Sequence, residues 1–276
     1  MERIIEADVE IKNCQFGNKN WIRVRSSIED CQFGNNIFIG FFANIQNTIL
    51  GQGIQIASGV RCGNSAKDRV IIEDYVWIGA QAIIEPGVIV HKGAVIGART
   101  HIMEDVPEYS IVRFDREKQK NVVYSRNLDM DMPPKLGEIF NYFLIRHNEN
   151  SGLTEDNNGN YISTNLSKKL VNLGNSNIFI GGLSGGVAVG DRVKIGSKNI
   201  FEGAGKIFIG EDSVIGNGVH ILSNSHNHKK LSLPMTFNSV HIGKNVVIGD
   251  NVLIFPGISI SDNTEVPNGS MILKDM

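Results

Sequence analysis

The chain has 276 residues and is rich in isoleucine (37), glycine (30) and asparagine (29). Only 20% of the residues are charged and the formal net charge is −2, so the electrostatic attraction that nucleic-acid-binding proteins use is missing. The scarcity of leucine and alanine argues against a helical bundle, and glycine without an every-third-residue period excludes collagen. The length allows one large or two small globular domains.

The location of the protein is indicated by what the sequence lacks. The longest apolar runs, such as 252–255, are too short to cross a bilayer, and the first residues lack the basic-then-apolar order of a secretion signal. Three cysteines, Cys14, Cys31 and Cys62, cannot all pair and show no CxxC spacing. They are expected to be reduced thiols that pack as small hydrophobic side chains. These features predict a cytoplasmic protein without a transmembrane segment.

Aliphatic residues recur at every sixth position over long stretches. This period matches neither an amphipathic helix nor a half-buried strand. Shorter sets occupy 33–45, 189–201 and 209–221. The two longest sets are Ile72, Ile78, Ile84, Val90, Ile96 and Ile102 in the first half, and Ile242, Ile248, Ile254, Ile260, Val266 and Ile272 in the second.

Glycine often follows the aliphatic residue, and a small or β-branched residue tends to lie four places after it. A triangular coil explains this pattern, because each hexad can form one short strand and one turn. The aliphatic side chain points inward, and glycine supplies turn conformations that strain other residues. Three hexads make one coil of about 18 residues, and stacked coils pair as parallel strands. The sequence therefore predicts an all-β chain with two blocks of parallel β-helix, although the spacing does not fix the handedness.

The most regular stretches, Val-Trp-Ile-Gly-Ala at 76–80 and Val-Val-Ile-Gly-Asp at 246–250, resemble the hexapeptide-repeat acyltransferases. The resemblance is closest to the sugar and polysaccharide O-acetyltransferases and covers roughly 5–112 and 176–276. It implies a left-handed β-helix in each block and a homotrimer with sites between protomers. It also implies acetyl-CoA as co-substrate.

Three segments follow from the repeat. We expect an N-terminal β-helix domain over 1–112, a mixed linker over 113–175 and a C-terminal β-helix domain over 176–276. The linker loses the six-residue period and gains charge. A proline pair followed by apolar residues at helical spacing predicts a short amphipathic helix at about 134–147.

The repeat is interrupted at two places, 62–68 and 222–239, and both are predicted loops. Loops on a rigid scaffold often carry binding and catalytic residues. The first has no histidine, whereas the second contains His226 and His228. His220 and His241 flank this loop at outward repeat positions, where we expect solvated or edge-packed side chains.

The form Ser-His-x-His in the second loop resembles the segment that carries the catalytic base in sugar and xenobiotic acetyltransferases of this family. The resemblance implies that His226 is the base, and that His228 and Asn199 contact the acceptor. Imidazole is suited to take a proton from an alcohol as the alcohol attacks a thioester.

The same resemblance implies that CoA contacts Asp250, Asn268, Gly269 and Lys274. The first block has no matching histidine and carries Glu104 in place of the lysine. We therefore expect the first block to be non-catalytic and the second to be the catalytic domain.

The leading hypothesis is an acetyl-CoA-dependent O-acetyltransferase that acts on a saccharide hydroxyl, as in polysaccharide biosynthesis. One alternative is an N-acetyltransferase of an amino sugar or nucleotide sugar, and another is a non-catalytic trimeric β-helix scaffold. A zinc site built from His226, His228 and either His220 or His241 is a further alternative. The His-x4-His pair of the γ-class carbonic anhydrases, which share the fold, is absent, so we expect no metal and no nucleic-acid partner.

Overall fold

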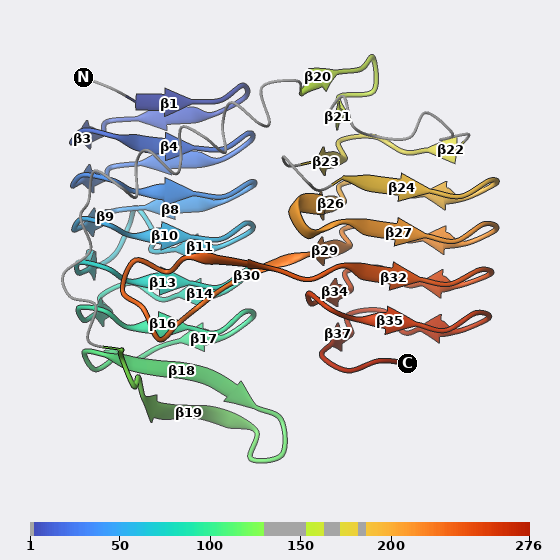
Figure 1. Cartoon of the computed structure of the whole chain (residues 1–276). Helices are drawn as coiled ribbons and strands as arrows, with labels where there is room; N and C mark the ends of the chain where they lie inside the picture. The colour runs from blue at the N-terminus through green and yellow to red at the C-terminus, as the bar shows by residue number, and fades with distance from the viewer. Residues whose placement is uncertain (1–2, 130–152, 163–171, 182–185) are drawn as a thin grey trace. The chain divides into compact units, whose positions relative to one another are not determined.

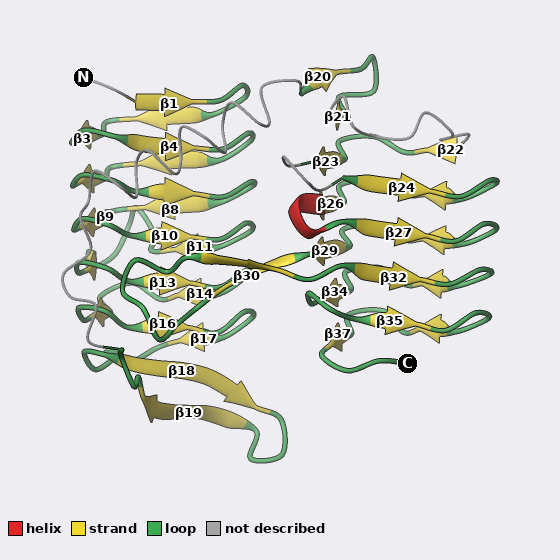
Figure 2. Cartoon of the chain, viewed as in Figure 1, coloured by secondary structure: helices red, strands yellow, loops and turns green. Residues whose placement is uncertain are grey.

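The structure is a computed structural model that describes residues 3–129, 153–162, 172–181 and 186–276. Over these residues it consists of short strands and one 3-10 turn, η1 (Gly203–Gly205) (Figure 2). The amphipathic helix expected at about 134–147 lies outside the described residues. The chain separates into two compact units. The first comprises Met1–Phe143 and His228–Pro234, and the second comprises Leu144–Asn227 and Met235–Met276.

The first unit is a stack of coils in which each coil contributes one strand to each of three parallel sheets (Figure 1). Its first sheet contains β1 (Arg3–Ile5), β4 (Asn20–Ile22), β7 (Phe38–Ile39), β10 (Gln55–Ile56), β13 (Trp77–Ile78), β16 (Val95–Ile96), β18 (Ser110–Asp115) and β19 (Lys120–Ser125). Its second sheet contains β2 (Glu10–Lys12), β5 (Ser27–Glu29), β8 (Asn44–Gln46), β11 (Arg61–Cys62), β14 (Ile83–Ile84) and β17 (His101–Ile102). Its third contains β3 (Gln15–Phe16), β6 (Gln32–Phe33), β9 (Thr48–Leu50), β12 (Val70–Ile72) and β15 (Ile89–Val90).

The inward residue of each strand lies over the inward residue of the next coil. Ile22 pairs in register with Ile5 and Ile39, and Ile78 pairs with Ile56 and Ile96. The predicted parallel β-helix is thereby confirmed for this block. The first coils are one residue shorter than expected, since equivalent positions lie 17 residues apart there.

Asparagine and aspartate occupy many of the corners between strands. Asn13, Asp30 and Asn47 follow one another at one corner of the first unit, each with a φ angle between 45° and 55°. Asparagine and aspartate tolerate this left-handed conformation better than most residues. Corners of this kind therefore account for part of the asparagine excess of the sequence.

The first sheet continues beyond the last regular coil. β18 pairs in parallel with β16, and β19 then folds back antiparallel to β18. Residues up to Ser125 thus extend the first sheet past residue 112, where the six-residue period ends.

The second unit has the same three-sheeted build. One sheet contains β20 (Thr154–Glu155), β21 (Tyr161–Ile162), β23 (Ile178–Ile180), β26 (Ile200–Glu202), β29 (His220–Leu222), β34 (Leu253–Ile254) and β37 (Met271–Ile272). A second contains β22 (Asn172–Leu173), β25 (Lys194–Ile195), β28 (Val214–Ile215), β33 (Val247–Ile248) and β36 (Glu265–Val266). A third contains β24 (Val187–Val189), β27 (Ile207–Ile209), β32 (Val240–Ile242) and β35 (Ser259–Ile260).

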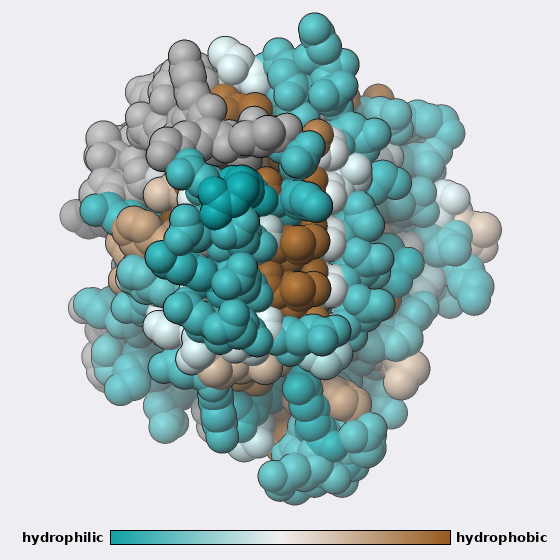
Figure 3. Space-filling model, turned by 90° about the vertical axis from the view of Figure 1, so that its right-hand side faces the viewer, coloured by the Kyte–Doolittle hydropathy of each residue, from teal (hydrophilic) through white to brown (hydrophobic). Residues whose placement is uncertain are grey.

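Inward-facing aliphatic residues fill the second unit as they fill the first, and Phe179 stacks on Phe201 inside it with ring centroids 4.5 Å apart. Outward positions are mostly polar, but Val214 and Val247 pair in register and are about 40% exposed. Figure 3 shows a face on which apolar residues gather in a narrow stripe bordered by polar ones. Among the described residues, no helix is long and apolar enough to span a membrane.

Candidate functional site

A β-hairpin occupies the second interruption of the repeat. Its strands are β30 (Asn224–His226) and β31 (Met235–Phe237), which pair antiparallel so that His226 faces Met235 across the ladder. The hairpin leaves the coil after β29, at the corner where the chain passes to β32 (Figure 1). His226 is half-buried and is the last residue of the first hairpin strand.

The base of the hairpin is fixed to the coil through Ser223. Its hydroxyl donates to the carbonyl of Glu202 (2.6 Å) and accepts from the backbone N–H of Gly205 (2.8 Å). The N–H of Asn238 on the returning chain donates to the carbonyl of Ser223 (3.0 Å). A Cβ atom at Gly205 would lie 2.2 Å from the Ser223 carbonyl oxygen. Only glycine permits the η1 turn to approach the hairpin this closely.

The tip of the hairpin, residues 228–234, is part of the first compact unit. There the Arg126 guanidinium donates to three backbone carbonyls: those of His228 (2.6 Å), Lys230 (2.8 Å) and Gly93 (2.6 Å). The side chain is buried, and this burial lowers the pKa of Arg126 to about 10. A neighbouring contact joins the Asp129 N–H to the Lys229 carbonyl (2.8 Å). The guanidinium thus links two segments that lie more than one hundred residues apart in sequence.

His228, the predicted acceptor ligand, has its imidazole against the indole of Trp77. The ring centroids are 4.8 Å apart and the planes are inclined by 62°. Leu231 and Leu233 of the same tip are 1% exposed. The tip is therefore an ordered, packed element rather than an open loop, and a role of His228 toward an acceptor stays a prediction.

The flanking histidines differ from the expectation. His220 is 1% exposed, and its Nε2 lies 2.9 Å from a Glu202 carboxylate oxygen, so the expected solvated or edge position is wrong for this residue. The side chain is enclosed because β29 lies between two neighbouring strands, on which His220 pairs in register with Ile200 and Leu253. His241 matches the expectation, since it stacks on Phe208 (4.7 Å) and contacts the Ser239 hydroxyl.

Asn199, the other predicted acceptor ligand, belongs to an internal ladder of asparagines. Its Oδ1 accepts from the Val219 N–H (2.6 Å), while its own N–H donates to Oδ1 of Asn177 (2.9 Å). Asn177 in turn contacts Oδ1 of Asn160. Asn199 is fully buried in this ladder, so its side chain does not reach the surface of the coil.

The residues predicted to contact CoA divide into two groups. Asp250, Asn268 and Gly269 meet at one corner, where the Asp250 N–H donates to Oδ1 of Asn268 (2.8 Å) and the Gly269 N–H to the Asp250 carbonyl (2.7 Å). Asp250 also accepts from the side chain and backbone of Asn217. Open space lies beside the Gly269 Cα atom, where a Cβ would have no neighbour within 4 Å. Lys274 is exposed beyond β37.

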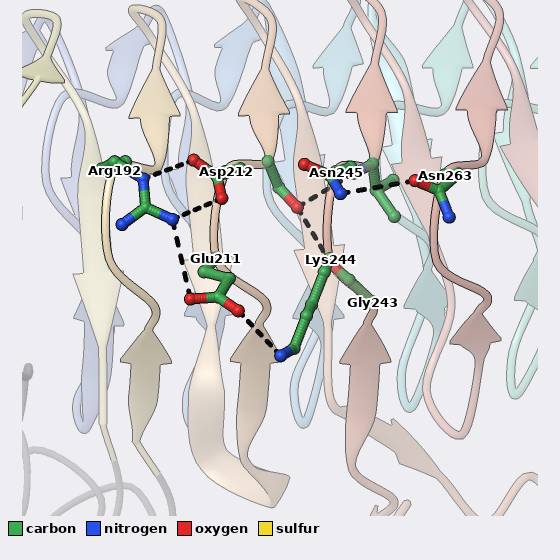
Figure 4. Close-up of polar contacts among 9 residues, drawn as sticks. Arg192, Glu211, Asp212, Gly243, Lys244, Asn245 and Asn263 are labelled. Atoms are coloured by element: carbon green, nitrogen blue, oxygen red, sulfur yellow. Dashed lines mark hydrogen bonds and ion pairs between the residues drawn. The ribbon is translucent and has the colours of Figure 1, made fainter.

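Another corner of the second unit carries a ladder of ion pairs (Figure 4). Arg192 donates to both carboxylate oxygens of Asp212 (2.6 and 2.5 Å), and Lys244 contacts Glu211 (2.7 Å). These side chains are exposed and paired between neighbouring coils. The ladder therefore joins coils rather than forming a buried site. Among the residues that the structure describes, no cluster of three or more histidine, cysteine, aspartate or glutamate side chains could hold a metal ion.

The sequence predicts no role for Arg126 at this site. It lies in the expected linker, outside the six-residue period, and its partners follow more than one hundred positions later. No sequence spacing connects such distant segments. The contacts between Arg126 and the tip are evident only in the folded structure.

Two family models match the chain, one in each block. The bacterial transferase hexapeptide model (six repeats) matches residues 69–103, and the hexapeptide repeat of succinyl-transferase matches residues 239–274. Both matches lie in the regular coils predicted from the aliphatic period.

Curated relatives match over short stretches. A chloramphenicol acetyltransferase of Agrobacterium fabrum is 55% identical over 47 residues, which are 17% of this chain and 22% of the relative. A galactoside O-acetyltransferase of Lactococcus lactis is 40% identical over 52 residues, 19% of this chain and 25% of the relative. The chain thus spans about a quarter of the length of each of these relatives.

Among solved structures, AntD, an N-acyltransferase from Bacillus cereus in complex with dTDP and 3-hydroxybutyryl-CoA, is similar with a TM-score of 0.41 and 18% identity. The similarity covers 51% of this chain and 86% of AntD. A hexapeptide-repeat model in each block and the matched acetyltransferases confirm the predicted resemblance to the hexapeptide-repeat acyltransferases.

Proposed function

We propose that the protein transfers an acetyl group from acetyl-CoA to a hydroxyl group of a saccharide, with His226 as the general base. The observation that carries the proposal is the placement of His226 on an ordered hairpin that interrupts the second block of coils. The names of the matched relatives, a chloramphenicol acetyltransferase and a galactoside O-acetyltransferase, support acetyl transfer to an oxygen. We further propose that the reaction takes place in the cytoplasm, where the three cysteines would remain reduced.

The chemistry requires one group that both takes and returns a proton. The neutral imidazole of His226 accepts the proton of the acceptor hydroxyl while the oxygen attacks the thioester carbonyl carbon. A C–O bond forms and the C–S bond then breaks. The imidazolium gives the proton to the departing CoA sulfur, so the products are an acetyl ester and CoA thiol. No covalent enzyme intermediate and no metal ion are needed.

The proposed CoA-contacting residues lie at a different corner from the hairpin. Asp250 lies between β33 and β34, and Gly269 lies at the same corner of the next coil, between β36 and β37. The hairpin instead leaves between β29 and β32. Two corners of one triangular coil point away from each other, so they cannot line one site within a single β-helix. We therefore propose a homotrimer in which one protomer supplies His226 and its neighbour supplies the CoA contacts. In that arrangement Lys274 offers a cation for a CoA phosphate.

The test is release of CoA thiol from acetyl-CoA in the presence of mono- and oligosaccharides and of amino sugars. With His226→Gln we expect kcat to fall by about 10²–10⁴-fold, because the base is lost. The matched control His241→Gln alters an exposed histidine outside the hairpin and should leave turnover unchanged.

The possible outcomes are distinct. Undiminished turnover in His226→Gln would remove His226 from the mechanism. Turnover on amines but not on alcohols would favour an N-acetyltransferase. Failure to bind acetyl-CoA in calorimetry would favour a non-catalytic scaffold.

A further inference from the structure

We propose that Ser223 is a positioning residue for the reaction at His226, because it fixes the point at which the hairpin leaves the coil. The residues that carry this inference all belong to the second compact unit. The inference rests on the proposed function for its catalytic consequence, whereas the fixed base of the hairpin follows from hydrogen bonds alone.

Ser223 is the first residue that departs from the regular ladder of this unit. The pairing of β29 with β26 ends where Leu222 lies opposite Glu202. In the next coil, residues 255–258 alone lead from β34 to β35 around the same corner. After Ser223 the chain instead enters β30, which carries His226 out of the coil. The backbone direction at Ser223 therefore sets the direction of the strand on which the candidate base lies.

The hydroxyl of Ser223 connects this departure point to the preceding coil. Its Oγ donates to the Glu202 carbonyl (2.6 Å) and accepts from the Gly205 N–H of the η1 turn (2.8 Å). The Ser223 N–H donates to the same Glu202 carbonyl (3.1 Å), and the Ser223 carbonyl accepts from the N–H of Asn238 on the returning chain (3.0 Å). The side chain is fully buried, so water does not compete for these hydrogen bonds. Both ends of the hairpin and the η1 turn thus meet at one residue, and we call this meeting point the Ser223 joint.

A second serine of the same unit shows what such a hydroxyl does where no hairpin follows. Ser213 is also fully buried, donates to the Gly243 carbonyl (2.9 Å) and accepts from the Val246 N–H (3.1 Å). Its partners lead into the regular strand β33, so its hydrogen bonds only join one coil to the next. The Ser223 hydroxyl joins two coils in the same way, but it also fixes the start of β30.

Small rotations at Ser223 become larger displacements at His226. Three residues of extended chain separate the two, which corresponds to about 10 Å at the usual rise of a strand. A rotation of about 6° at one end of such a segment moves the other end by about 1 Å. A displacement of that size can slow a reaction about a hundredfold, because the base must lie within hydrogen-bond reach of the acceptor. Loss of the Ser223 hydroxyl should therefore reduce turnover, although no atom of Ser223 takes part in the proton transfer.

The experiment compares Ser223→Ala with the matched control Ser213→Ala in the full chain. Each substitution removes one buried hydroxyl and leaves one backbone N–H without its acceptor, so both should lower the midpoint of urea unfolding to a similar extent. Hydrogen–deuterium exchange at Gly205 and residues 224–226 reports the Ser223 joint. Steady-state kinetics with acetyl-CoA, and with the mono- or oligosaccharide that the wild type acetylates fastest, reports kcat and the KM for acetyl-CoA.

We expect Ser223→Ala to speed exchange at Gly205 and along residues 224–226, to lower kcat by about ten- to hundredfold, and to leave the KM for acetyl-CoA within about twofold. Ser213→Ala should speed exchange at Val246 and keep the wild-type kcat, although it loses a similar share of stability. If Ser223→Ala does not fold, Ser223→Cys keeps a weak S–H donor and acceptor in the same place and should show the same pattern to a smaller extent.

Equal kcat values in Ser223→Ala and Ser213→Ala would overturn the positioning role, because the Ser223 hydroxyl would then only join coils. Unchanged exchange at Gly205 and residues 224–226 in Ser223→Ala would overturn the joint itself. If the wild type transfers no acetyl group while Ser223→Ala still speeds exchange at the joint, the proposed function fails and the positioning role fails with it, but the joint stands.

Discussion

The imidazole of His228 lies edge-on against the indole of Trp77, with ring centroids 4.8 Å apart. Trp77 is the outward residue of β13, next to the inward Ile78. At the matching place in the second block the chain has Val247, which is exposed. The tryptophan thus marks the position on the first block where the hairpin tip packs.

This ring contact should contribute measurably to the closed tip. A double-mutant cycle of Trp77→Ala and His228→Ala, read from the exchange of the Leu233 amide, should give a coupling energy of about 0.5–1.5 kcal/mol. Trp77→Phe should retain part of it, because a phenyl ring can still meet the imidazole edge. A coupling of zero would mean that the two rings are neighbours without mutual stabilisation.

The asparagine ladder predicts that Asn199 acts on stability rather than on acceptor affinity. Asn199→Ala removes the acceptor of the buried Val219 N–H, which should lower the free energy of unfolding of the second unit by about 1–3 kcal/mol. Asn175→Ala, at an exposed corner, serves as the matched control and should cause little change. Denaturant unfolding of the two variants measures the change in the free energy of unfolding. A raised KM for the acceptor in Asn199→Ala would contradict a purely structural role of Asn199.

The thiols should differ in reactivity. Burial raises the pKa of both Cys31 and Cys62 to about 12, whereas Cys14 is half-buried. Only a thiolate is nucleophilic, so at pH 8 the native protein should react with a disulfide reagent at Cys14 alone, and denaturant should release two more thiols. Because the folded pKa values lie above those of the unfolded chain, this stabilisation is complete below pH 9 and is lost as the pH rises toward 12. Fast native labelling of Cys62 would contradict this.

Two ion pairs should differ in their effect on stability. Arg23 and Glu6 are at most 10% exposed and lie 2.7 Å apart, and Arg23 is also stacked between the rings of Trp21 and Phe41. Glu6→Gln should cost about 3 kcal/mol, because it leaves a buried guanidinium without its counter-ion.

The matched control for that pair is Asp212→Asn, which removes the exposed partner of Arg192. Water and salt screen this pair, so we expect no measurable change in the midpoint of urea unfolding. Equal effects of the two substitutions would show that burial does not set the strength of these pairs.

The regular coils could be predicted because they are local. Each inward residue, such as Ile78 or Ile248, is identified by neighbours six positions away, and stacking these residues buries them in either block. The corners at Asn13 and Asn47 follow the same logic, since a left-handed turn selects asparagine by its own backbone preference. The segment around His226 could be predicted as a loop because the six-residue period is interrupted there.

The sequence by itself therefore determined the β-helical blocks, the buried stack and the segment that carries the candidate base. Only the tertiary structure decided that this segment is a hairpin, that its tip packs against Trp77, and that Arg126 holds it. The physical reason is that a period records interactions between residues at a fixed separation. The contacts of Arg126 join carbonyl groups, which every residue carries, across more than one hundred positions. Backbone acceptors leave no mark in the amino-acid sequence, so their use depends on the folded chain.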